Sequence, residues 1–297
     1  MGKWLKSTES VQFEVAERVA RITLNRPDKR NAINGALLRE LKEALLEADD
    51  LKSVNVIVLR GAGKDFCAGY DLVTTYSDRA AEQVDPGEYR GTVRSFDDDC
   101  WSMERQAETV NAMADVHKPI IAQVHGNCLA GGTDLALACD MVLAADNARI
   151  GFPATRANGS PPAHMWFYHV GPQWAKRLLL SGDSLTGRDA AKIGLVMDAV
   201  PAEELEAEVA ELARRLSFVD ADLLSANKRI VNLGLELAGA RTLQRLAVEN
   251  DARAHQSQGP RRAQFKADME ANGLKEALKR RDEPFGDGVI KLRARGE

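Results

Sequence analysis

A run of apolar, largely β-branched residues at positions 54–59 (VNVIVL) constrains the fold more than any other feature of the chain. An apolar run of this kind, without polar alternation, is typical of a strand that is buried on both faces. Further strand-like runs cover residues 120–124 (IIAQV) and 141–145 (MVLAA), and residues 97–113 have helical character. Strands that alternate with helices in this way predict an α/β layered core.

The segments on either side extend this prediction. Residues 11–15 and 19–24 predict a hairpin that turns at residues 16–18, and Asn34 is expected to cap the helix that follows. The polar stretch from about residue 74 to residue 94 predicts a surface loop or lid. After Pro162 the pattern is helical almost throughout, so we expect an α/β core over residues 1–200 and a helical region over residues 201–297.

Composition excludes several classes of protein. The 40 Lys and Arg residues nearly balance the 44 Asp and Glu residues, which removes the electrostatic case for general nucleic-acid binding. No apolar run approaches the roughly 20 residues that cross a bilayer, and the N-terminus lacks the apolar core of a signal peptide. The four cysteines form no CxxC pair and are predicted to be reduced core thiols. We therefore expect a soluble cytoplasmic protein with neither nucleic acid nor membrane as a partner.

Two glycine-bearing turns follow predicted strands, at residues 61–71 (GAGKDFCAGYD) and 125–134 (HGNCLAGGTD). Neither matches the GxGxxG or GxxxxGK[ST] nucleotide-binding motif. Glycine lets a backbone approach a ligand, and Gly131-Gly132 precedes a helix whose N-terminus favours negative charge. Two such turns could form an oxyanion hole. Plain strand-to-helix turns would have the same residues, and the residues alone favour that plainer alternative.

Five sequence segments, taken in their order along the chain, favour a functional interpretation of these turns. They are residues 24–32 (LNRPDKRNA), 66–72 (FCAGYDL), 118–122 (KPIIA), 131–140 (GGTDLALACD), and 180–182 (LSG) with 190–196 (AAKIGLV). In these segments the chain resembles the crotonase (enoyl-CoA hydratase/isomerase) superfamily, and the resemblance extends from about residue 11 to residue 285. Each segment is modest alone, but five in the family's order are highly specific.

The resemblance implies a crotonase-type spiral of ββα units over residues 1–200, which holds a coenzyme A thioester site, and a C-terminal helical trimerisation region over residues 201–297. It implies an acyl-CoA thioester as partner, a homotrimer or a dimer of trimers, and no cofactor other than the coenzyme A of the substrate. By motif position, the backbone amides of Tyr70 and Gly131 form the oxyanion hole. The Tyr70 side chain is bulkier than the small residue common there, which predicts a narrower acyl pocket.

Further residues are assigned to substrate binding through the same resemblance. In this family, basic residues near the first motif and on the C-terminal helices commonly bind the coenzyme A phosphates. Lys279, Arg280 and Arg281 are therefore candidates for phosphate binding. The alternative for each is an ordinary solvated charge on the surface. The remaining substrate-binding positions implied are Lys29, Arg30, Ala32, Ala68, Asp71, Leu72, Leu129, Pro153, Ala154 and His164.

Two positions depart from the family pattern. Asp134 aligns with the first of two family glutamates, and its side chain is shorter by one methylene, roughly 1.5 Å. We predict it as the catalytic acid/base, the alternative being a carboxylate that stabilises the first turn of a helix. Ala154 occupies the second glutamate position and cannot transfer a proton. His164 could serve as acid or base, although a packed histidine is the more common case.

The predicted function is that of an enoyl-CoA hydratase/isomerase-family enzyme, which hydrates an enoyl-CoA through an enolate held in the oxyanion hole. Hydration needs a base on water and an acid near the α-carbon, and one of the two family carboxylates is absent. Two alternatives therefore stay open at this point. One is an acyl-CoA hydrolase or lyase that uses Asp134, and the other is an acyl-CoA-binding member without catalysis.

Overall fold

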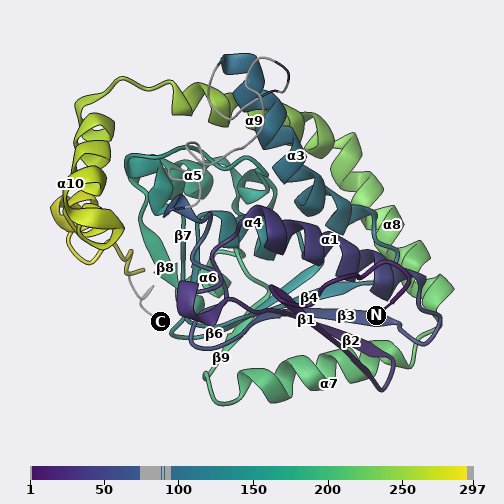
Figure 1. Ribbon diagram of the computed structural model, residues 1–297. Helices are drawn as coiled ribbons and strands as arrows, with labels where there is room; N and C mark the ends of the chain where they lie inside the picture. Colours follow the sequence, from purple (N-terminus) through teal and green to yellow (C-terminus); the bar gives the residue numbers. More distant parts are fainter. Residues whose placement is uncertain (1, 74–87, 89, 91–94, 293–297) are drawn as a thin grey trace.

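The computed structural model describes residues 2–73, 88, 90 and 95–292. Most of the predicted loop or lid at residues 74–94 lies outside the described residues. The larger sheet has the strand order β1-β2-β3-β4-β6-β9 (Figure 1). Its strands are β1 (Val11–Ala16), β2 (Val19–Leu24), β3 (Val56–Gly61), β4 (Ile120–Val124), β6 (Met141–Ala145) and β9 (Asp198–Val200). Only β1 and β2 pair antiparallel within it, as the predicted hairpin, and the other neighbours are parallel.

A smaller sheet has the order β5-β7-β8, with β5 (Asn127–Leu129), β7 (Arg149–Gly151) and β8 (Ser184–Thr186). The consecutive strands β4 and β5 lie in different sheets, and so do β6 and β7. The helix α4 (Gly131–Leu137) follows β5 directly. The chain therefore advances by strand, strand and helix, which is the geometry of a ββα spiral.

Helices cover both faces of the larger sheet. The helix α1 (Gly35–Asp50) lies on one face with α3 (Phe96–Asp115) packed on it, and α7 (Leu205–Ser217) lies on the opposite face (Figure 1). Asn34 caps α1 as predicted, because its side chain accepts a hydrogen bond from the Leu37 amide at 2.9 Å. The hairpin turn at Glu17 and Arg18 has positive φ at both residues, as the twist of paired strands favours.

The prediction of an almost wholly helical chain after Pro162 was wrong at β8 and β9. Each has three residues, which is too short for a period to be visible in the sequence. The remaining helices are α5 (Trp166–Ser181), α6 (Gly187–Lys192), α8 (Ala221–Leu237), α9 (Ala240–His255) and α10 (Pro260–Asp282), with short 3₁₀ turns η1 (Pro27–Lys29), η3 (Pro153–Arg156) and η4 (Glu283–Phe285). The α9 helix packs along α3 (Figure 1). The α10 helix contacts η3. The domain division at residue 200 stays a prediction, and α7 beyond it packs against the larger sheet.

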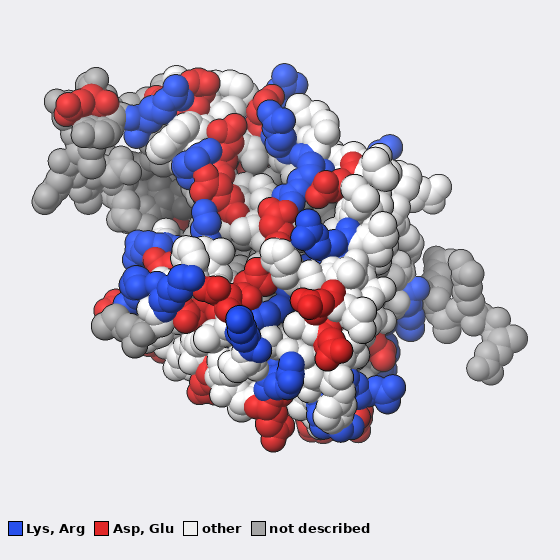
Figure 2. All heavy atoms as spheres, turned by 90° about the vertical axis from the view of Figure 1, so that its right-hand side faces the viewer, with Lys and Arg blue, Asp and Glu red and all other residues white. Residues whose placement is uncertain are grey.

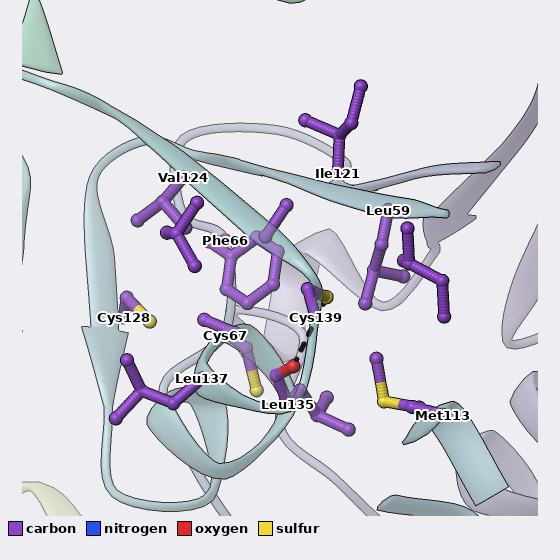
Figure 3. Close-up of a cluster of buried hydrophobic side chains, with 14 of the residues drawn as sticks. Leu59, Phe66, Cys67, Met113, Ile121, Val124, Cys128, Leu135, Leu137 and Cys139 are labelled. Atoms are coloured by element: carbon purple, nitrogen blue, oxygen red, sulfur yellow. Dashed lines mark hydrogen bonds between the residues drawn. The ribbon is translucent and has the colours of Figure 1, made fainter. Parts of the chain in front are cut away.

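The main core lies between the sheets and their helices. Figure 3 shows part of it, where Cys67, Cys128 and Cys139 sit among apolar side chains such as Phe66. The Cys139 thiol contacts the Leu135 carbonyl oxygen at 3.4 Å. All four cysteines are free and buried. Burial raises the pKa of the Cys67 thiol to about 12, so that thiol is protonated and unsuited to nucleophilic attack.

Basic and acidic side chains are interspersed on the face shown in Figure 2, with uncharged surface between them. Within the described ranges, no helix is both long enough and apolar enough to span a bilayer.

Candidate active site

The candidate site lies where the parallel strands β2, β3 and β4 end. Each of them continues into a turn at its carboxyl end, where open α/β sheets bind ligands. These turns are residues 25–33, 62–71 and 125–130. Gly126 shows how closely they stack, since a Cβ there would lie 1.9 Å from the carbonyl oxygen of Lys64.

Two buried polar side chains hold the three turns together. Asn31, fully buried, donates through Nδ2 to the carbonyl oxygens of Ala62, Asp65 and Phe66 at 2.9, 2.7 and 3.1 Å. Asp65 Oδ1 accepts from the backbone amide of Asn127 at 2.9 Å and from its side chain at 2.6 Å. The first turn is thereby bonded to the second, and the second to the third.

The Tyr70 amide is left without a partner by the strand-like pairing around it. The Ile33 amide donates to the Gly69 carbonyl at 2.8 Å, and the Asp71 amide donates to the Ile33 carbonyl at 2.8 Å. In a parallel bridge of this kind, the residue between the two bonded ones directs its own N–H away. The Tyr70 amide accordingly donates to none of the described residues.

The Gly131 peptide lies directly beside this turn. A Cβ on Gly69, whose φ is +102°, would lie 2.8 Å from Ala130 Cβ and 3.3 Å from the Gly131 nitrogen. The Gly131 amide is the first of α4 and, like that of Tyr70, donates to no other described residue. Ala130 has φ +49° and ψ −122°, a strained backbone conformation for a residue with a side chain. Two unpaired amides thus meet in adjacent turns, the arrangement of an oxyanion hole.

Asp134 lies in the first turn of α4 and is 1% exposed. Neither carboxylate oxygen accepts a hydrogen bond of normal geometry from a described residue, although the Tyr70 hydroxyl is close enough to affect it. Burial raises the pKa of Asp134 well above its usual range, the charge of Asp251 raises it further, and the Tyr70 hydroxyl lowers it. A buried carboxyl group without partners favours its neutral form, so Asp134 can hold a proton at neutral pH and donate it.

The Tyr70 side chain closes one side of the same space. A Cβ on Gly131 would lie 2.7 Å from Tyr70 Cε2, so the ring packs over the Gly131 backbone. Burial and the charge of Asp134 raise the pKa of the Tyr70 hydroxyl well above its usual range, which keeps this group protonated. The hydroxyl is therefore a hydrogen-bond donor beside Asp134.

Comparison with known proteins identifies the family. The sequence profile of enoyl-CoA hydratase/isomerase matches residues 14–266. The chain belongs to the enoyl-CoA hydratase/isomerase family. This confirms the predicted crotonase resemblance and makes the chain a member of a family of enzymes.

Relatives and solved structures agree with this. The 2,3-dehydroadipyl-CoA hydratase of Escherichia coli is 32% identical over 225 residues, which are 75% of this chain and 81% of that protein. The crotonyl-CoA hydratase of Syntrophomonas wolfei is 31% identical over 248 residues, 82% of this chain and 88% of that protein. An enoyl-CoA hydratase structure from Mycobacterium smegmatis matches with a TM-score of 0.85 at 35% identity, covering 94% of this chain and 95% of that one. The predicted crotonase-type fold with a C-terminal helical region is confirmed.

The structure brings several other predicted site residues of this enoyl-CoA hydratase-family chain to the three turns. Arg26 donates to the Ala32 carbonyl and pairs with the buried Asp71 at 2.9 Å, which fixes the first turn against the second. Ala68 and Leu129, each two residues before one of the two amides, are half-buried. Leu72 packs on a small cluster that includes Phe265 of α10 and Ala157, so the C-terminal helices reach the site's edge.

The turn that holds Ala154 carries no acidic side chain of its own. Pro153 and Ala154 form part of the 3₁₀ turn η3, and both are half-buried. His164 is also half-buried, burial lowers its pKa, and it makes no hydrogen bond to a described residue. Nothing in the described contacts links His164 to Asp134. The role of His164 stays a prediction.

The basic candidates for the coenzyme A phosphates differ in their surroundings. Lys29 is exposed, and Arg30 is exposed and 3.9 Å from Asp65 Oδ2. Arg280 pairs with Asp268 at 2.8 Å. Lys279 is exposed on α10, whereas Arg281 is buried and bonded to Asp282 and Asn158. Lys29, Arg30 and Lys279 therefore have the accessibility that a phosphate contact requires.

Sequence reasoning missed Asp251 of α9. Its carboxyl is 5% exposed, and its charge raises the pKa values of both Asp134 and Tyr70. Asp251 lies outside the motif segments, and a lone carboxylate on a helix usually faces water. The only available signal was its spacing from His255, four residues on, which puts the two side chains on one face of the helix.

Proposed function

We propose that this protein hydrates an enoyl-CoA thioester, with Tyr70 and Gly131 as oxyanion donors and Asp134 as the proton donor. The observation that carries the proposal is the meeting of two unpaired amides with one buried, unpartnered carboxyl group. The names of the relatives, hydratases of 2,3-dehydroadipyl-CoA and crotonyl-CoA, support the same reaction class.

The reaction follows from where charge develops. Water oxygen bonds to the β-carbon, and the electron pair of the double bond moves onto the thioester oxygen. The two amides stabilise that enolate oxygen, and each such donor typically lowers the activation barrier by about 3–4 kcal/mol. Asp134 then gives its proton to the α-carbon as the enolate collapses. The water must lose a proton to a base, and general acid–base catalysis typically contributes 10²–10⁴-fold.

Asp134→Asn tests the proposal, because the amide cannot deliver the proton. Hydration of crotonyl-CoA, followed by loss of the conjugated thioester absorbance, should fall at least about 100-fold in kcat. Binding of the saturated butyryl-CoA, measured by calorimetry, should be retained. Glu249→Gln removes one carboxylate from an exposed position and should behave as the unmodified protein does.

Each contrary outcome has a distinct meaning. An unchanged kcat in Asp134→Asn would remove Asp134 from the mechanism. Absence of turnover in the unmodified protein on crotonyl-CoA and on longer or branched enoyl-CoAs, with butyryl-CoA still bound, would overturn hydration. It would leave thioester cleavage or a binding role, which the alanine at position 154 would then explain.

We propose further that copies of this chain assemble as a trimer or a dimer of trimers through α8. Large apolar side chains on this helix are exposed, including Ile230 at 63%, Val231 at 66% and Leu237 at 82%. A groove of about 560 Å³ opens beside them against the end of α3. Light scattering during gel filtration should give at least three times the chain mass, and Ile230→Glu should reduce it without loss of fold.

The proposed reaction balances with water and the thioester alone, so we propose no cofactor beyond the coenzyme A of the substrate. Turnover should survive treatment with a metal chelator. A cytoplasmic site of action remains our proposal from the sequence, and it accords with four reduced, buried cysteines.

A further inference from the structure

Asp251 lies on α9, outside the motif segments, and packs against residues 159 and 160, which follow the turn that holds Ala154. Its charge raises the pKa of Asp134 and the pKa of Tyr70. Its carboxylate is nearly inaccessible, so this effect acts through protein rather than through bulk water. A buried carboxylate beside another buried carboxyl is costly and calls for an explanation.

The Asp251 carboxylate is seated on the segment that begins at Ala154. The Ser160 amide donates to Asp251 Oδ1 at 2.7 Å. The Gly159 amide turns back to the Ala154 carbonyl at 3.2 Å. Gly159 leaves room for the carboxylate, since a Cβ there would lie 2.4 Å from Oδ1. The segment that lacks an acid at Ala154 therefore receives one from α9.

A relay of side chains holds Asp251 in place. His255 Nε2 lies 3.7 Å from Asp251 Oδ1, and His255 Nδ1 lies 2.8 Å from Asp99 Oδ2 on α3. Asp99 is 1% exposed. The second oxygen of Asp251, Oδ2, has no hydrogen-bond partner among the described residues. One oxygen is thus fixed and the other is available to accept a proton.

We infer that Asp251 is the second acid–base carboxylate of the site, which accepts the proton of the attacking water while Asp134 protonates the α-carbon. The inference rests on the proposed hydration. As the water oxygen bonds to the β-carbon, its proton passes to Asp251 Oδ2. The Asp134 proton forms the new bond at the α-carbon. After the product leaves, the proton on Asp251 returns to Asp134 through solvent, and the net change is the addition of one water.

The different surroundings of Asp251 and Asp134 suit the first to act as a base and the second to act as an acid. Burial raises the pKa of Asp251 to about 6, so at pH 7 it is mostly ionised and can act as a base. Burial without a hydrogen-bond partner raises the pKa of Asp134 well above its usual range and favours its protonated form. A pair of titratable groups with separated pKa values is the usual basis for distinct acid and base roles. The charged or titratable groups that act on Asp251 or respond to it are His255, Asp99, Arg262, Asp134 and Tyr70.

Asp251→Asn in the full chain tests the inference, because the amide keeps the shape and removes the base. We expect kcat for crotonyl-CoA to fall about 100-fold or more, with butyryl-CoA affinity within about threefold. The acidic limb of the pH profile of kcat/KM, with an apparent pKa near 6, should disappear. Asp251→Glu keeps a carboxylate and should keep the limb even if its rate is lower, whereas Glu249→Gln on the same helix should change neither.

An Asp251→Asn variant that retains kcat within about threefold, or that keeps the acidic limb at a lower rate, would overturn the inference. Loss of activity in Asp134→Asn beside full activity in Asp251→Asn would overturn it alone and leave hydration standing. Absence of turnover in the unmodified protein would instead overturn the proposed function. If Asp251→Asn does not fold, judged by circular dichroism, loss of the acidic limb in Asp251→Glu would overturn the inference.

Discussion

Replacing Gly131 by alanine tests the oxyanion hole itself. A Cβ at this position would lie 2.7 Å and 2.8 Å from Cε2 and Cδ2 of the Tyr70 ring, and 3.0 Å from Ile33 Cδ1. Side-chain Cβ atoms essentially never approach other atoms below 3.0 Å, so the Tyr70 ring must shift away from the new methyl group. We expect part of this displacement to reach the Tyr70 backbone, which would move its amide relative to the Gly131 amide.

The expected size of the effect follows from the loss of one donor. Removing one oxyanion donor costs about 3–4 kcal/mol, which corresponds to a loss of about 100- to 1000-fold in kcat. The assay is initial-rate hydration of crotonyl-CoA at saturating and at low substrate concentration, beside a thermal melt to establish folding. Gly35→Ala is the matched control, because a Cβ there meets no atom within 4 Å, and its rates should equal those of the unmodified protein within about twofold.

The result that would refute this reasoning is a folded Gly131→Ala variant whose kcat stays within about threefold. The thioester oxygen would then not depend on the Gly131 amide. A loss confined to KM would also contradict it, since an interaction specific to the enolate is lost in kcat.

Two further predictions concern stability. Because the pKa of Asp251 is raised from 3.8 to about 6 in the folded state, this group contributes most stability below pH 3.8, and about 3 kcal/mol is lost as pH rises from 3 to 7. Urea unfolding should show Asp251→Asn gaining about 3 kcal/mol over the unmodified protein at pH 7.5 and only about 1 kcal/mol at pH 4.5. An equal gain at both pH values would contradict the assigned pKa. Asn31→Ala leaves three carbonyl oxygens without their hydrogen-bond donor. In the same assay it should lower the free energy of unfolding by about 2–4 kcal/mol, and a loss below 1 kcal/mol would contradict this role of Asn31.

The sequence allowed the larger sheet to be predicted because its strands are long enough to show a pattern. The expected strands at residues 120–124 and 141–145 have the same bounds in the structure. β3 begins two residues later than expected because the Val54 amide closes a turn onto the Leu51 carbonyl, and the Asn55 amide donates to the carbonyl of Arg18 in the hairpin turn. The strands of the smaller sheet have three residues each, and their pairing depends on contacts between distant segments that no local pattern encodes.

Some residues of the candidate site could likewise be predicted from the sequence, and others could not. Tyr70, Gly131 and Asp134 lie in motif segments, so the resemblance could point to them, and the structure brings them together. Asn31 lies in a quoted motif, but its three hydrogen bonds appear only once the turns stack. Asp251 could not be found from sequence, because its burial depends on how α9 packs along α3 and over residues 154–160.

Three costly features meet at this one place. Asp134 has two oxygens without partners, Asp251 is a buried carboxylate with a raised pKa, and Ala130 has a positive φ. Each costs on the order of 1–3 kcal/mol, and a fold selected only for stability would replace them by apolar or glycine residues. These features occur together with the unpaired amides of Tyr70 and Gly131. Enolate chemistry requires such a combination: free hydrogen-bond donors, a protonated acid and a base that is shielded from bulk water. The inferred role of Asp251 would also explain why an alanine is tolerated at position 154, because a carboxylate bonded to Ser160, six residues on, would take over proton transfer.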